Sequence, residues 1–126
     1  MNKMLTPREI ADLAAEALDD KKGRDIVLLR TTDVTVLADY FLICTAGSST
    51  HIKTLSDEVE RVLEERGERP LRVEGRRSGG WVLIDFGCVV VHLFLSEARE
   101  FYTLERLWGD AEKVENDVGA DSIRPM

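Results

Sequence analysis

Two stretches of the chain carry hydrophobic residues at the spacing of an α-helix. The first begins at residues 6–9, where Thr6 and Glu9 have the spacing of a capping box, and it ends at Gly23. The second follows a Gly-Ser turn and stops at Gly67. Both patterns predict helices that bury one face and expose the other. The buried stripes are Ile10, Leu13, Ala14, Ala17 and Leu18 in the first helix, and Ile52, Leu55, Val59, Val62 and Leu63 in the second.

The other hydrophobic segments are short and separated by turn residues, which is typical of strands. The segment 40–45 is hydrophobic without alternation, which indicates a strand covered on both faces. Residues 81–85 and 89–95 flank a turn around residues 86–87 and predict an antiparallel hairpin. Ser96 is the expected N-cap of a last helix. The predicted strands are residues 25–30, 34–37 continuing into 40–45, 71–74, 81–85 and 89–95. Phe101, Leu104 and Trp108 share one face of the predicted last helix.

The elements follow one another in the order α-β-β-α-β-β-β-α. This order predicts an α/β fold with a mixed, mostly five-stranded sheet flanked by helices. The strand–helix–strand unit over residues 40–74 is expected to be a right-handed crossover between parallel strands. No repeat or linker divides the chain, so residues 1–111 are predicted to form a single domain. Residues 112–126 lose the hydrophobic pattern and are expected to be a polar, frayed tail.

The composition is that of a globular protein with a surplus of acid. The 126 residues include 17 Lys+Arg and 24 Asp+Glu, a formal net charge of −7, and 44% of them are hydrophobic. No apolar segment approaches the ~18 residues of a membrane span, and no leader peptide is recognisable, so a cytoplasmic protein is expected. The acid surplus disfavours a protein that holds nucleic acid mainly by its phosphates, because that mode of binding needs a basic face.

The cysteines and histidines do not have the spacing of a metal site. Cys44 and Cys88 lie in hydrophobic segments and are expected to be buried, reduced thiols. Together with His51 and His92 they could supply four zinc ligands, but the close pairs typical of zinc sites are missing. We therefore predict no metal and no cofactor. His92 has hydrophobic neighbours on one sheet face, so we expect a core or interface histidine bonded to a backbone group rather than a catalytic base.

The turn Gly47-Ser48-Ser49 precedes a helix, where free N–H groups could hold a phosphate. It lacks the lysine of a P-loop and the glycines of a dinucleotide loop, and helix capping accounts for its residues. Nucleotidyltransferases place such a turn beside two metal-binding carboxylates, whereas the strand 81–85 offers only Asp85. We therefore predict no catalytic residue, and a small nucleotide-binding enzyme is the alternative.

One basic patch and one tryptophan stand out around the glycine-rich loop. Arg72, Arg76 and Arg77 form the basic patch, and because the chain is acidic overall we expect them to be solvated or to form salt bridges. An RNA-contacting edge is the alternative. Trp81 begins a strand beside this loop and is expected to be partly exposed. Trp, Tyr and Arg are enriched at the hot spots of protein interfaces, so this region is a candidate for binding a protein partner.

Several short motifs follow one another along nearly the whole domain, from about Thr6 to Ala111. They are Asp39-Tyr40-Phe41, Thr45-Ala46-Gly47-Ser48-Ser49 with His51 following, Glu74-Gly75, Gly80-Trp81-Val82-Leu83-Ile84-Asp85, Val90-Val91-His92-Leu93-Phe94, Arg99-Glu100-Phe101-Tyr102 and Leu104-Glu105-Arg106-Leu107-Trp108. In this order and spacing they closely resemble the ribosomal silencing factor family, also called Iojap-like. Each motif alone is weak, but together they are specific.

The resemblance implies a nucleotidyltransferase-like fold without known catalysis, often as a homodimer. It implies binding to the fourteenth protein of the large ribosomal subunit, on the face that meets the small subunit. Subunit joining would then be blocked sterically, and translation would fall when nutrients are scarce. No membrane contact and little or no direct nucleic-acid binding are expected. Carried onto this chain, the docking surface is predicted around Trp81, Asp85, His92, Arg99, Tyr102 and Trp108.

Two further functions stay open beside this one and the nucleotide-binding enzyme. Organellar relatives act in assembly of the large subunit, but no transit segment is recognisable here, which favours the bacterial cytoplasmic role. A homodimeric interaction module with a partner outside the ribosome is the other alternative.

Overall fold

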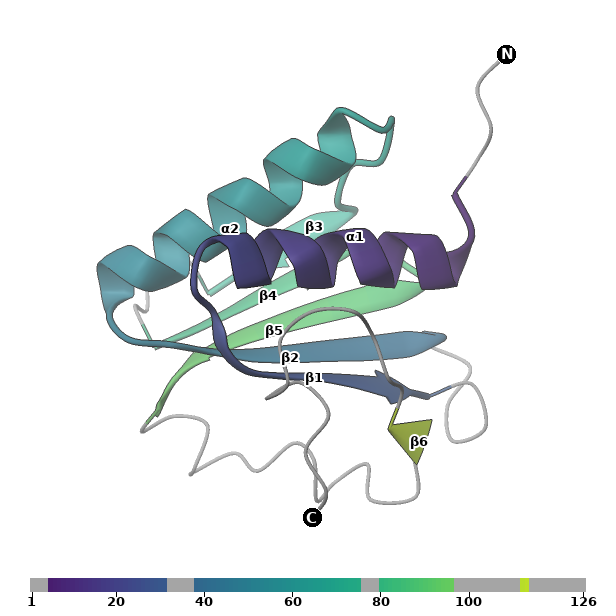
Figure 1. Ribbon diagram of the computed structural model, residues 1–126. Helices are drawn as coiled ribbons and strands as arrows, with labels where there is room; N and C mark the ends of the chain where they lie inside the picture. The colour runs from purple at the N-terminus through teal and green to yellow at the C-terminus, as the bar shows by residue number, and fades with distance from the viewer. Residues whose placement is uncertain (1–4, 32–37, 76–79, 97–111, 114–126) are drawn as a thin grey trace.

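The structure, a computed structural model, describes residues 5–31, 38–75, 80–96 and 112–113. Within these ranges the chain forms two helices and one six-stranded sheet (Figure 1). The α/β class and the order of the first seven described elements are those predicted from the sequence. The helices are α1 (Pro7–Asp20) and α2 (Ser49–Glu64), and the strands are β1 (Arg24–Arg30), β2 (Tyr40–Ala46), β3 (Arg72–Glu74), β4 (Trp81–Asp85), β5 (Val89–Leu95) and β6 (Glu112–Lys113).

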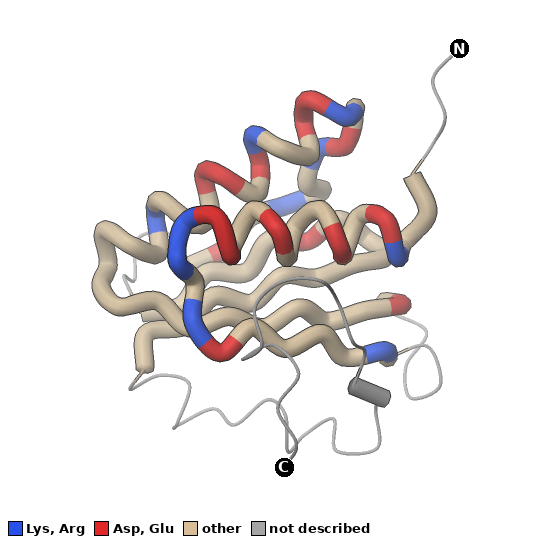
Figure 2. The backbone as a smooth tube through the Cα atoms, viewed as in Figure 1, with Lys and Arg blue, Asp and Glu red and all other residues tan. Residues whose placement is uncertain are grey.

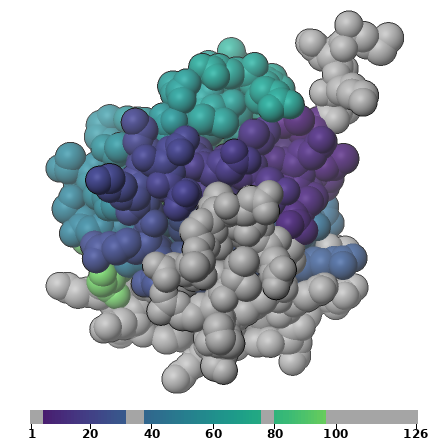
Figure 3. Space-filling view, in the orientation of Figure 1, coloured from purple at the N-terminus to yellow at the C-terminus, as the bar shows by residue number. Residues whose placement is uncertain are grey.

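Both described helices lie on the same face of the sheet (Figure 1). The capping box predicted for α1 is present: the Thr6 hydroxyl accepts a hydrogen bond from the Glu9 N–H, and the Glu9 carboxylate accepts one from the Thr6 N–H. The buried stripe of α1 is rich in alanine, and such small side chains let α1 pack closely against α2. In the space-filling view the two helices form one continuous layer (Figure 3). Neither described helix is long and apolar enough to cross a membrane.

The sheet is mixed, with the strand order β3-β4-β5-β2-β1-β6. β2 and β5 are parallel, and every other neighbouring pair is antiparallel, including the predicted hairpin of β4 and β5. The predicted parallel relation of β2 and β3 is confirmed, with α2 as the connection between them. β5 and β4 lie between these two strands, which the sequence did not indicate.

The sheet extends beyond the predicted boundary of the domain. Glu112–Lys113, the first two residues of the predicted tail, form β6 and pair with β1. An edge strand such as β1 offers unpaired backbone groups, and β6 supplies partners for two of its residues. The remainder of the tail, the predicted strand segment 34–37 and residues 97–111 of the predicted last helix lie outside the described residues, so the single-domain assignment stays a prediction.

Hydrophobic side chains are buried on both faces of the sheet. The larger core lies between the helices and the sheet and contains Leu18, Leu55 and Leu93. On the opposite face lies a second cluster, made of Val27, Leu29, Ile43 and Phe94 with the partly buried Phe41 and Trp81; we call it the second-face cluster. The unbroken hydrophobic run predicted to be covered on both faces is β2, and five of its seven residues are buried.

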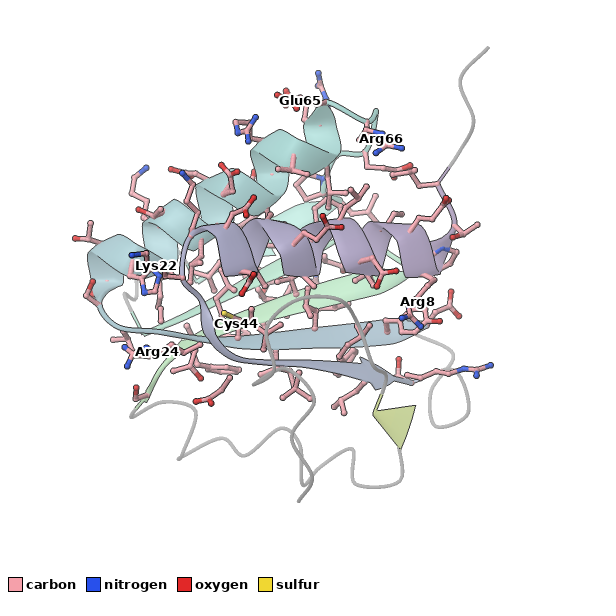
Figure 4. All side chains as sticks on the ribbon, in the orientation of Figure 1. Arg8, Lys22, Arg24, Cys44, Glu65 and Arg66 are labelled. Carbon is pink, nitrogen blue, oxygen red and sulfur yellow. The ribbon has the colours of Figure 1, made fainter. Side chains whose placement is uncertain are left out.

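The end of α1 fits closely against β2. The Gly23 N–H donates to the Leu18 carbonyl oxygen at 2.8 Å and closes the helix. A Cβ atom on Gly23 would lie 2.5 Å from the Cys44 sulfur and 3.0 Å from that carbonyl oxygen, so only glycine fits. Figure 4 labels Cys44 beneath the C-terminal part of α1. Both cysteines are free thiols, and Cys44 is buried as predicted, whereas Cys88 is only partly buried because it lies in the β4–β5 turn.

We expect the Gly23→Ala variant to lose about 1–3 kcal/mol of unfolding free energy, because its methyl group overpacks the contact with Cys44. Urea unfolding measures the loss. In a Cys44→Ala background the same substitution should cost less, since the sulfur is gone. Gly80→Ala is the matched control, because its Cβ would meet nothing within 4 Å. Equal losses at Gly23 and Gly80 would show that the close contact does not matter.

Candidate functional site

Three of the six predicted docking residues lie in the described part of the chain. Trp81 and Asp85 stand at the two ends of β4, and His92 lies on β5 opposite Leu83. Because side chains alternate along a strand, these three residues share the sheet face that carries the second-face cluster. The structure therefore brings them together on one face, opposite α1 and α2. Arg99, Tyr102 and Trp108 lie outside the described residues.

Trp81 is partly exposed, as the sequence predicts. Its ring stacks on Phe94, the residue paired with it on β5, with ring centroids 6.4 Å apart and an angle of 26° between the planes. Gly75 lies against the backbone of Trp81, so closely that a Cβ atom on Gly75 would clash with the Trp81 carbonyl oxygen. A large aromatic side chain is thus held in one place and still reaches solvent.

His92 is only 7% exposed and lies among aromatic rings. Its ring centroid is 5.0 Å from that of Phe41 and 6.2 Å from that of Phe94, to which its plane is nearly parallel. The predicted core position is confirmed, but the predicted bond to a backbone group is wrong: within the described structure neither ring nitrogen has a hydrogen-bond partner. The reason is its apolar surroundings, because aromatic faces surround the ring where a carbonyl oxygen was expected.

Burial also determines the charge of His92. Removal from water lowers the pKa of His92 to about 4, and the negative charge of Asp85 opposes this shift. The ring is therefore neutral at pH 7. A neutral, buried ring stabilises the face by packing and does not offer a positive charge to a partner.

Asp85 holds the end of the β4–β5 hairpin in place. Its Oδ1 accepts a hydrogen bond from the Gly87 N–H at 2.7 Å, and Gly87 has a positive φ of 88°. Its Oδ2 accepts from the Arg72 guanidinium at 3.3 Å, and Arg72 also pairs with Glu74 at 2.7 Å. The salt-bridge role predicted for Arg72 is confirmed, whereas Arg76 and Arg77 lie outside the described residues. The Asp85 carboxylate is thus already engaged within the chain.

The Gly47-Ser48 turn is also engaged within the chain. Ser48 caps α2 by accepting a hydrogen bond from the His51 N–H, which confirms the capping role. His51 Nδ1 accepts from the Gly47 N–H at 2.8 Å, so the ring proton is on Nε2, which donates to the Lys21 carbonyl oxygen at 2.8 Å. Sequence reasoning missed this bridge between the end of α1 and the start of α2, because the two partners lie 30 residues apart.

A cation lies beside the Gly47-Ser48 turn. The Arg24 guanidinium lies against Gly47, where a Cβ atom would be 2.5 Å from its nitrogen, and Figure 4 labels Arg24 below Lys22. Of the residues that the structure describes, no three His, Cys, Asp or Glu side chains are grouped closely enough to hold a metal ion.

The acid surplus of the chain is concentrated on the helices. α1 carries five acidic residues and one basic residue, and α2 carries four acidic and two basic residues. Figure 2 shows these acids along both helices, which cover the sheet face opposite the second-face cluster. Exposed ion pairs such as Lys53–Asp57 neutralise only part of this charge. The molecule therefore has one acidic helical layer and one aromatic sheet face.

The neutral state of His92 gives acid sensitivity to the fold. The unfolded chain takes up a proton near pH 6.5, but the folded protein does so only near pH 4. The unfolding free energy should therefore fall as the pH drops through this window, by about 3 kcal/mol in total. In the His92→Phe variant this part of the pH dependence should disappear. Urea unfolding at several pH values from 7.5 to 4 compares the two proteins, and identical pH profiles would contradict the expectation.

Comparisons with known proteins agree with this structure. The family profile described as ribosomal silencing factor during starvation matches residues 5–125. A ribosomal silencing factor RsfS of Halalkalibacterium halodurans is 41% identical over 111 residues, which cover 88% of this chain and 95% of that protein. The mitochondrial assembly of ribosomal large subunit protein 1 of Mus musculus is 31% identical over 77% of this chain and 44% of that longer protein.

A crystal structure of a Chromobacterium violaceum protein has the same fold. It superposes with a TM-score of 0.82 at 41% sequence identity, covering 92% of this chain and 96% of the other. The motifs, the family profile and the fold point to the same conclusion. This chain belongs to the ribosomal silencing factor family.

Proposed function

We propose that this protein is a translational repressor that binds the large ribosomal subunit and sterically blocks joining of the small subunit, especially under nutrient limitation. Its contact on the large subunit is the fourteenth protein of that subunit, on the face that meets the small subunit. Membership in the ribosomal silencing factor family is the observation that carries this proposal. We place the protein in the bacterial cytoplasm and propose that it forms a homodimer.

A steric mechanism needs affinity and shape but no reaction. The described residues fit such a role, because the Gly47-Ser48 turn and Asp85 are engaged in internal hydrogen bonds. Relatives are named as silencing factors, which supports a regulator that is not an enzyme. A protein interface of the usual size, about 1,600 Å², is enough to hold such a factor in place.

Within the predicted docking set, Trp81 has the properties of an interface anchor. It is aromatic, partly exposed and held by Phe94 and Gly75, so little side-chain freedom is lost on binding. His92 is buried beneath the face, and Asp85 is tied to Arg72 and Gly87. We propose that Trp81 contacts the partner directly, whereas His92 and Asp85 keep the face in shape.

The charge distribution supports a protein partner rather than RNA. Nine acids on α1 and α2 would repel the phosphates of ribosomal RNA. These acids contribute to the net charge of −7, which favours encounter with a basic ribosomal protein because opposite charges attract at long range. The aromatic face would then make the specific contact.

A second candidate function is assembly of the large subunit. It is favoured by the mouse relative, whose name assigns it to assembly of the mitochondrial ribosomal large subunit. An assembly factor binds immature particles, whereas a silencing factor binds mature large subunits.

Sucrose-gradient sedimentation with purified subunits tests the proposal. The protein should co-sediment with mature large subunits, and in excess it should reduce the fraction of joined ribosomes. Unchanged subunit joining with the protein in excess would overturn the proposed mechanism. Binding to immature particles alone would favour the assembly function instead.

The Trp81→Ala variant should bind the large subunit about 30-fold more weakly, since loss of an anchoring tryptophan typically costs 2 kcal/mol or more. Trp81→Phe is the matched control, because a phenylalanine keeps an aromatic ring over Phe94 and should retain most of the affinity. Co-sedimentation over a range of protein concentrations measures both. Cooperative thermal unfolding shows whether each variant folds, and a folded Trp81→Ala protein with full affinity would remove Trp81 from the interface.

A further inference from the structure

β3 is the strand at one edge of the sheet. Its only strand neighbour in the described structure is β4, so its other side faces outward. α2 packs on β2, β4 and β5. Leu71 lies just before β3. It is 74% exposed, and among the described residues it is the large hydrophobic side chain that is exposed. An edge strand flanked by an exposed leucine is a template for pairing with another strand.

The hydrogen-bond pattern of the sheet determines which backbone groups of β3 point outward. In the β4–β5 hairpin the Phe86 N–H donates to the Val89 carbonyl oxygen. In an antiparallel pair every second residue bonds to the same neighbour, so Ile84 and Val82 direct their backbone groups toward β5. The other β4 residues, Leu83 and Asp85, face β3, where they pair with Glu74 and Arg72. Val73 lies between these two pairs and therefore directs its N–H and C=O groups away from β4.

The charges of β3 are arranged symmetrically about Val73. Arg72 precedes it, Glu74 follows it, and the two side chains are 62% and 45% exposed on the same face of the sheet. In an antiparallel pairing of two identical β3 strands centred on Val73, each arginine stands opposite the glutamate of the other copy. Leu71, just outside the strand, then lies at the end of this pairing, next to Gly75 of the other copy. The strand is therefore complementary to itself.

We propose that two copies of this protein join edge to edge through β3, antiparallel and with their two-fold axis at Val73. The two Val73 residues exchange backbone hydrogen bonds, and the sheet continues from one copy into the other. The two Arg72 and two Glu74 side chains form a ring of alternating charge, a network of the kind in which exposed ion pairs contribute to stability. This inference rests on the homodimer of the proposed function and gives it an interface.

The edge is short, so the contact is weak and reversible. Val73 supplies one hydrogen-bonded pair, and Leu71 supplies the apolar contact. Interfaces below about 1,200 Å² are typically weak, so detecting the dimer should need concentrations of the purified protein as high as about 500 µM. The association should weaken as the salt concentration rises, because salt screens exposed charges.

Sedimentation equilibrium of charge-reversed proteins tests the interface. In the Arg72→Glu variant an acid at position 72 of each copy stands opposite Glu74 of the other copy. In the Glu74→Arg variant a base at position 74 of each copy stands opposite Arg72 of the other. Each variant alone should self-associate at least about tenfold more weakly than the natural protein, because like charges would then face each other. A mixture of the two variants should form a heterodimer, since the acids of one stand opposite the bases of the other.

Matched controls separate this interface from a general effect of charge. Arg61→Glu and Glu65→Arg make the same changes of charge on exposed residues near the end of α2, and they should leave self-association unchanged. Cooperative thermal unfolding confirms that each variant folds.

The failures of the interface and of the proposed function can be told apart. A dimer that persists in both β3 variants, or variants that do not associate when mixed, would overturn the β3 interface. The homodimer of the proposed function would remain in the first case. A monomeric natural protein at about 500 µM would overturn both the homodimer and its interface. Binding to the large subunit is measured separately, so it is affected by none of these outcomes.

Discussion

The parallel pairing of β2 with β5 is the interaction on which the rest of the structure depends. Seven consecutive residue pairs join these strands, from Tyr40 with Val89 to Ala46 with Leu95. A parallel pair cannot be closed by a tight turn, so the chain between them must leave the sheet and return. That chain supplies α2, β3 and β4. The helical layer, the sheet edge at β3 and the aromatic face all follow from this one non-local pairing.

Local patterns in the sequence predicted the elements but not their neighbours. The capping box at Thr6 and the hydrophobic stripes located α1 and α2, because helix formation depends on residues three and four apart. The position of β5 between β2 and β4 depends on long-range pairing, which no short segment encodes. β6 was missed for the same reason, since two residues pair with β1 without a hydrophobic pattern of their own.

The predicted docking site stays a prediction, and the structure adds contacts that the sequence did not show. Family motifs placed Trp81, Asp85 and His92 together, and the structure puts them on one face. The role of each residue depends on partners that are distant in sequence: Phe94 under Trp81, Arg72 beside Asp85, and Phe41 against His92. Spacing alone cannot show that His92 lacks a hydrogen-bond partner, because that depends on which side chains the fold brings around the ring.

The buried state of His92 makes the charge of the aromatic face constant. An exposed histidine gains a positive charge as the surroundings become mildly acidic, because its ordinary pKa lies near 6.5. His92, with its pKa near 4, remains uncharged down to about pH 5. The affinity of a partner for this face therefore does not vary with the protonation of His92 when a cell acidifies modestly. Mild acidity, which would switch the charge of an exposed histidine, thus leaves His92 in the same state.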